Sequence, residues 1–78
     1  MAALRLFASA REAAGTGRDD VPGRTVAEIL DEAVRRYGAG FAALLPTCRV
    51  WVNGEQADGD TPVAVGDEVA VLPPVSGG

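Results

Sequence analysis

A single amphipathic helix between Thr25 and Tyr37 limits the folds open to this chain, because one helix can cover only one face of a sheet. The helix is predicted to begin with a capping box, in which the Thr25 hydroxyl accepts a hydrogen bond from the Glu28 N–H and the Glu28 side chain reaches back to Thr25. Apolar residues follow at helical spacing, and Gly38 is suited to end the helix. This pattern predicts an α+β fold with the helix packed on one face of a sheet.

Short segments with strand patterns flank the helix on both sides. The expected strands are residues 3–8, 20–22, 48–52 and 68–72, with a short strand after the Asn53-Gly54 turn. A short helical turn followed by a loop is expected over residues 11–17, and another short helical turn over residues 41–45. This order places the first and last strands side by side in the middle of the sheet. The expectation is therefore the β-grasp, or ubiquitin-like, topology: a mixed sheet of four to five strands on one main helix.

The composition removes most catalytic arrangements. The chain has 78 residues, no histidine and one cysteine, so it forms one domain without a Ser-His-Asp or Cys-His arrangement or an internal disulfide. No Cys or His cluster can hold a metal, and we expect neither a metal nor a bound cofactor. Cys48 is expected to be a buried structural thiol. If the chain takes part in chemistry, its reacting group is something other than a side chain.

The charge and the N-terminal segment indicate where such a chain acts. A net charge of −4 argues against nucleic acid or an anionic membrane as partner and favours a basic protein surface. All seven basic residues are arginine, so the chain offers no lysine amine for isopeptide links. Ala8-Ser9-Ala10 resembles a signal cleavage site, but Arg5 interrupts the short apolar stretch before it. No run approaches the roughly 20 apolar residues of a membrane span, and we expect a cytoplasmic protein.

The last six residues are the strongest candidate for a reactive group. Pro73-Pro74 ends the last strand, so the expected domain covers residues 1–74 and a tail of Val75, Ser76, Gly77 and Gly78 follows it. Glycine has no Cβ, so such a tail can enter a narrow channel and leave its acyl carbon open to attack. ATP can activate the Gly78 carboxylate as an acyl-adenylate, which a sulfur donor or an enzyme cysteine can attack. A terminus without function is the alternative.

A candidate docking surface follows from the period-2 geometry of the strands. Alternate residues face the helix, namely Leu4, Leu6, Val50, Val52, Val69 and Val71. The same alternation sends Phe7, Trp51, Ala70 and Leu72 to the opposite face, close to the start of the tail. An exposed apolar patch on a small protein is typical of an interface. A position of Trp51 under a loop is the alternative.

Three segments of the chain resemble a known family. Pro73-Pro74-Val75-Ser76-Gly77-Gly78, preceded by Gly66-Asp67-Glu68-Val69-Ala70, is similar to the end of the small subunit of molybdopterin synthase. Val52-Asn53-Gly54-Glu55 in mid-chain matches a second signature of that family. Leu6-Phe7-Ala8 followed by Arg11-Glu12 matches a third, so the resemblance covers essentially the whole chain.

The resemblance implies a ubiquitin-like sulfur carrier. A related activating enzyme would adenylate the Gly78 carboxylate with ATP, and a sulfurtransferase or cysteine desulfurase would supply the sulfur of a thiocarboxylate. The tail, Val75 to Gly78, would insert into the large synthase subunit and deliver sulfur to cyclic pyranopterin monophosphate. The family's hydrophobic partner surface would map onto Phe7 and Leu72, near Pro73 and Pro74, and Trp51 and Ala70 would extend it by the strand geometry.

Several relatives share the Gly-Gly end. The thiamine sulfur carrier usually opens almost directly with its Asn-Gly-Glu hairpin strand, whereas here that motif lies at Asn53, after a strand and the helix. This position favours the molybdopterin pathway. Carriers for cysteine synthesis or tRNA thiolation, and ubiquitin-like protein modifiers, are the open alternatives.

Overall fold

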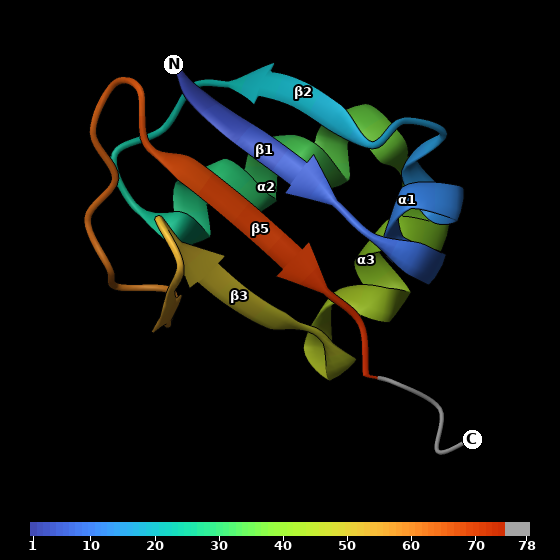
Figure 1. Ribbon diagram of the computed structural model, residues 1–78. Helices are drawn as coiled ribbons and strands as arrows, with labels where there is room; N and C mark the ends of the chain where they lie inside the picture. The colour runs from blue at the N-terminus through green and yellow to red at the C-terminus, as the bar shows by residue number, and fades with distance from the viewer. Residues whose placement is uncertain (75–78) are drawn as a thin grey trace.

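The computed structural model describes residues 1–74, and the tail residues Val75, Ser76, Gly77 and Gly78 lie outside the described part. Nine elements follow one another within these described residues (Figure 1). They are β1 (Ala2–Leu6), α1 (Ala8–Ala14), β2 (Arg18–Val21), α2 (Val26–Tyr37), α3 (Ala39–Leu44), a 3-10 turn η1 (Leu45–Thr47), β3 (Arg49–Val52), β4 (Glu55–Ala57) and β5 (Glu68–Leu72).

The strands form one mixed sheet whose order is β2-β1-β5-β3-β4. The first and last strands, β1 and β5, are parallel neighbours at its centre, and the other neighbouring pairs are antiparallel. The helices lie on one side of the sheet and leave the other side open (Figure 1). The predicted β-grasp topology is confirmed, including the central pairing of the first and last strands.

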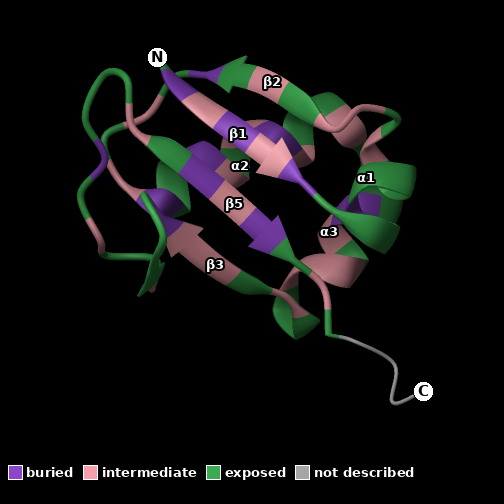
Figure 2. Ribbon diagram, in the orientation of Figure 1, coloured by how far each residue is buried: buried purple, intermediate pink, exposed green. Residues whose placement is uncertain are grey.

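The core lies between the sheet and the helices. Leu4 and Leu6 of β1 and Val69 and Val71 of β5 are buried, as the alternation predicts, and they form one cluster with the apolar side of α2 (Figure 2). Phe41 of α3 is completely buried in the same cluster. All thirteen buried hydrophobic residues lie between Ala2 and Val71, so the described part of the chain holds a continuous core.

The cap of α2 differs in one bond from the predicted capping box. The Glu28 N–H donates to Thr25 Oγ1 at 3.2 Å, as expected. The Glu28 carboxylate, however, accepts from the Arg24 N–H at 2.9 Å rather than from Thr25. Thr25 instead forms a bridge to Pro62, while the neighbouring Val26 N–H donates to Thr61 O. The start of α2 is thus held both by its own cap and by the segment that leads to β5.

The first strand ends earlier than the predicted range of 3–8, and the helix after it is longer than a turn. β1 stops at Leu6, and α1 begins at Ala8. The chain reverses there because Ala8 takes a positive φ of 49° and the Phe7 carbonyl accepts hydrogen bonds from Ala10 N–H and Arg11 N–H. Phe7 and Ala8, which the predicted strand included, therefore lie outside the strand pairing of β1.

A polar cluster joins β2 to the end of α2, and no sequence motif had indicated it. The Tyr37 hydroxyl donates to Asp19 Oδ2 at 2.6 Å, and Arg36 forms an ion pair with the same oxygen at 3.1 Å. The Tyr37 hydroxyl bond is the main cause that lowers the pKa of Asp19, and burial raises the pKa of Tyr37. Arg36 also binds Glu32 at 3.0 Å and the Asp20 carbonyl at 2.8 Å. This edge strand is therefore tied to the helix by polar bonds.

Candidate functional site

The open face of the sheet presents a row of side chains in register. Arg5 of β1 lies opposite Ala70 of β5, and Ala70 lies opposite Trp51 of β3. Trp51 in turn pairs with Gln56 of β4. None of these residues belongs to the buried core, and Trp51 and Ala70 are half-buried. The predicted outward placement of Trp51 and Ala70 is confirmed.

Phe7 and Leu72 extend this surface to one end of the two central strands. Their exposed fractions are 38% and 36%, among the largest for bulky apolar side chains in residues 1–74. Because β1 and β5 are parallel and Leu6 pairs with Val71, both strands end on the same side of the sheet, at the end defined by Leu6 and Leu72. The Arg5 guanidinium lies 5.6 Å from the centre of the Phe7 ring, within the range of a cation–π contact. We define the apolar patch as Phe7, Trp51, Ala70 and Leu72.

The chain leaves the sheet at this same end of β5. β5 ends at Leu72, and the half-buried Pro73 and the exposed Pro74 follow it without strand pairing (Figure 2). The prediction that the two prolines end the last strand is confirmed. The candidate reactive residues, Val75 to Gly78, lie outside the described residues, so their predicted role stays a prediction. The last described residues, Pro73 and Pro74, follow directly on Leu72 of the apolar patch.

Two of the sequence motifs meet at the opposite end of β5. The Asn53 amide donates to Asp67 Oδ1 at 3.0 Å, and Asn53 Oδ1 accepts from the Glu68 N–H at 2.9 Å. Asp67 also accepts from the Ala64 N–H at 2.8 Å. This backbone bond, followed by the Asn53 bond, lowers the pKa of Asp67. The Asn-Gly and Gly-Asp motifs therefore have a structural role: they fix the start of β5, at the opposite end of this strand from Leu72.

The described residues include one thiol, that of Cys48, and it is half-buried rather than fully buried as expected. Burial raises the pKa of the Cys48 thiol, which donates to the Leu44 carbonyl at 3.4 Å, so this thiol is a weak nucleophile. Residues 1–74 contain no group of three or more His, Cys, Asp or Glu side chains placed to hold a metal ion. Within the same residues, no helix is both long and apolar enough to cross a membrane. The apolar patch beside the chain exit is the main candidate site.

Comparison with known proteins gives a consistent result. The sequence matches the ThiS family over residues 4–78. Small archaeal modifier protein 1 (SAMP1) from Haloferax volcanii is 37% identical, with 99% of this chain and 98% of that chain covered and a TM-score of 0.82. A chain of the BexX/CysO complex from Amycolatopsis orientalis is 26% identical, with both chains covered completely and a TM-score of 0.85.

A third similar structure is a putative molybdopterin converting factor, subunit 1, from Pyrococcus furiosus. It is 26% identical, covers 95% of this chain and 97% of that chain, and has a TM-score of 0.81. No curated protein matches the sequence. The three structures are of about the same length as this chain and share its whole fold.

Proposed function

This chain belongs to the ThiS family and is a ubiquitin-like sulfur carrier, and from this premise we propose that it acts as the small, sulfur-donating subunit of a molybdopterin synthase. The family match runs through Gly77 and Gly78. The similar Pyrococcus furiosus protein is described as a molybdopterin converting factor subunit. The three sequence segments that resemble the small synthase subunit support the same assignment.

One structural observation carries the proposal. The parallel pairing of β1 with β5 places Phe7 and Leu72 at the end of the two strands where the chain continues toward Gly78. A partner that binds the apolar patch therefore receives the tail next to its own surface. A carrier whose partners supply the catalytic groups needs its folded domain to dock on the partner, so that its C-terminus is held close to those groups.

The proposed chemistry takes place at the Gly78 carboxylate. A carboxylate oxygen attacks the α-phosphorus of ATP in the activating enzyme, and pyrophosphate leaves. A persulfide of a sulfurtransferase or cysteine desulfurase then attacks the acyl carbon and displaces AMP. A second thiol of that enzyme then attacks the enzyme's own sulfur atom in the resulting acyl disulfide, forms a disulfide within the enzyme and releases the thiocarboxylate. Because the first step consumes ATP, we infer that the reaction takes place in the cytoplasm. The net charge of −4 disfavours nucleic acid or an anionic membrane as partner.

A second candidate function is protein modification. The small archaeal modifier protein from Haloferax volcanii is 37% identical to this chain, whereas the Pyrococcus furiosus factor is 26% identical. A modifier would use the same adenylate but would transfer the Gly78 acyl group to an amine of another protein. A carrier for cysteine synthesis or another pathway would form the same thiocarboxylate and differ only in the acceptor.

Intact-mass spectrometry separates these functions. The full chain is incubated with its adenylating enzyme, ATP and a cysteine desulfurase, and a carrier gains the mass difference between one sulfur and one oxygen. Addition of the large synthase subunit and cyclic pyranopterin monophosphate should reverse this gain and produce molybdopterin. Conjugates of higher mass would indicate the modifier, and a thiocarboxylate that the synthase does not consume would indicate another pathway.

Deletion of Gly78 is the matched control. Because the buried hydrophobic residues found within residues 1–74 all lie between Ala2 and Val71, the melting temperature of the shortened chain should equal that of the full chain. Its mass should stay unchanged after incubation with the same enzymes. A normal gain of sulfur by the shortened chain would contradict the role of Gly78.

A further inference from the structure

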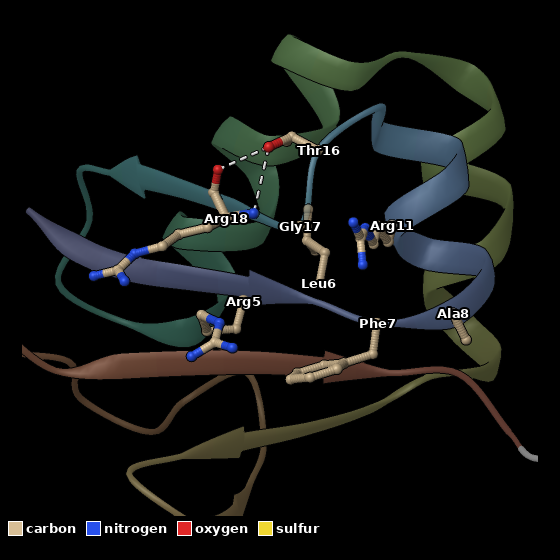
Figure 3. Close-up of a pocket in the computed structure, with 8 residues that line it drawn as sticks. All are labelled: Arg5, Leu6, Phe7, Ala8, Arg11, Thr16, Gly17 and Arg18. Carbon is tan, nitrogen blue, oxygen red and sulfur yellow. Dashed lines mark hydrogen bonds between the residues drawn. The ribbon is translucent and has the colours of Figure 1, made fainter.

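A groove of about 510 Å³ opens beside the apolar patch, where the end of β1, the start of α1 and the segment before β2 meet (Figure 3). Three arginines line it, from three different elements or their ends: Arg5, Arg11 and Arg18. Phe7 also lines the groove, so the groove and the apolar patch share a side chain. We call this site the arginine groove.

The arginine groove concentrates positive charge in a chain whose net charge is −4. Within residues 1–74, Arg11 and Arg18 form no ion pair, and Arg5 has one exposed partner, Glu68, at 3.5 Å. Arg5 and Arg18 lie directly opposite each other on the antiparallel pair of β1 and β2. Like charges in this position destabilise a sheet, and an anion bound between them would remove that repulsion.

The groove is also held in shape before any ligand binds. The Arg11 side chain lies against Gly17, where a Cβ would stand only 3.3 Å from Nε. The Thr16 hydroxyl donates to the Arg18 carbonyl at 2.9 Å and accepts from the Arg18 N–H at 3.3 Å (Figure 3). These contacts order the segment that carries three of the lining residues, Thr16, Gly17 and Arg18, which lowers the cost of binding.

We propose that the arginine groove binds a carboxylate-rich segment of the protein partner that docks on the apolar patch. The inference rests on the proposed function, because that partner is the protein that receives the tail. Guanidinium groups bind carboxylates through paired hydrogen bonds, and arginine is enriched in protein interfaces beside an apolar centre. Continuity with the patch through Phe7 favours a protein segment, and the net negative charge disfavours a nucleic acid.

This local preference differs from the one that the net charge suggests. The overall charge of −4 favours a basic partner surface, whereas the groove beside the patch selects an acidic one. A partner that matches both carries acidic residues next to the apolar contact and basic residues farther away. Such a pattern fixes the orientation of the docked domain and hence the direction from which the tail arrives.

The test is a titration of the ¹⁵N-labelled full chain with hexaglutamate, with hexaglutamine as the uncharged peptide of equal length. Hexaglutamate should shift the amide signals of residues 5–8 and 16–18, and hexaglutamine should not. The double variant Arg11→Gln with Arg18→Gln should bind hexaglutamate about tenfold more weakly. The matched control, Arg24→Gln with Arg35→Gln, loses the same charge outside the groove and should change the affinity less than about twofold.

Each other outcome overturns the inference. Equal loss in both double variants would show a general charge effect, and signal shifts confined to other residues would place the binding elsewhere. Tighter binding of inorganic pyrophosphate than of hexaglutamate at residues 5–8 and 16–18 would make the groove a phosphate site.

The fate of Gly78 is measured separately. Hexaglutamate binding without any activation of Gly78 would leave the groove standing and refute the proposed function. Normal activation of Gly78, together with unchanged hexaglutamate binding by the groove variant, would refute the groove alone.

Discussion

The side-chain amide of Asn53 donates a hydrogen bond to Asp67 Oδ1 at 3.0 Å and thereby joins the β3–β4 turn to the start of β5. Asn53 has a φ of 50°, in the left-handed region that asparagine tolerates better than most residues. One residue thus serves both the turn and the attachment of the central strand.

Replacement of Asn53 should separate these two roles. Asn53→Ala loses two side-chain hydrogen bonds and strains the backbone, so the free energy of unfolding should fall by about 2 to 4 kcal/mol. Asn53→Gly loses the same bonds but accepts the positive φ, so its loss should be smaller by about 1 kcal/mol. Urea denaturation of the three proteins measures both differences. A glycine variant as stable as the wild type would show that the side-chain bonds contribute nothing.

Tyr37→Phe should alter how stability depends on pH. The variant keeps the edge-to-face contact with Phe41, at 5.2 Å, but loses the hydroxyl bond to Asp19. Because folding lowers the pKa of Asp19, its charge stabilises the folded chain above its ordinary pKa of 3.8, and this stability is lost as the pH falls through the lower folded value. At pH 7 the variant should be less stable by about 1 kcal/mol, since the site is partly exposed.

The difference between wild type and Tyr37→Phe should then narrow as the pH falls below 3.8, because Asp19 is protonated first in the unfolded chain and, at still lower pH, in the folded chain. Urea denaturation at pH 7 and at lower pH gives the two differences. A gap that widens in acid would contradict the assignment of Asp19 as the ionised acceptor.

Phe7→Ala and Leu72→Ala should weaken partner binding more than folding. Both side chains are more than one-third exposed, so truncation should lower the free energy of unfolding by less than about 1 kcal/mol. Binding to the large synthase subunit, measured by calorimetry, should weaken at least about tenfold for each variant. Val65→Ala is the matched control, because Val65 is 86% exposed and lies outside the patch. A large loss of stability in either variant would show that the side chain mainly holds the fold.

Of the glycine-to-alanine substitutions in residues 1–74, Gly23→Ala should lower the free energy of unfolding the most. Gly23 has a φ of 157°, and a Cβ would stand 2.9 Å from Ile29 Cδ1 and 3.0 Å from the Ile29 backbone nitrogen, which cannot move without α2. We expect a loss of about 1 to 3 kcal/mol. Gly40→Ala in α3 meets no atom within 4 Å and should be neutral or stabilising by up to about 1 kcal/mol. Thermal unfolding followed by circular dichroism would contradict this reasoning if the order were reversed.

The sheet and the main helix were predictable because their sequence patterns repeat with the correct periods. The alternation at Leu4 and Leu6, and again at Val69 and Val71, survives as buried positions on neighbouring strands. The same rule placed Trp51 and Ala70 on the open face. Local pattern sufficed there because each residue's orientation follows from its own strand.

Features that depend on contact between two segments far apart in the sequence could not be predicted from the sequence. The bond between Tyr37 and Asp19 spans 18 positions and exists only after β2 docks on α2. The opposition of Arg5 and Arg18 depends on the register of β1 with β2, which no motif fixes. The early end of β1 was missed because the positive φ of Ala8 is not a preference of alanine. Tertiary contacts decided each of these cases.

The position of β5 between β1 and β3 has a mechanical consequence for any partner that grips the chain beyond Pro74. Tension along the axis of β5 loads its two flanking ladders in shear, so many hydrogen bonds resist together instead of opening one after another. The Asn53 and Asp67 attachment anchors the far end of the same strand. A partner can thus pull on the residues after Pro74 while the folded domain resists unfolding.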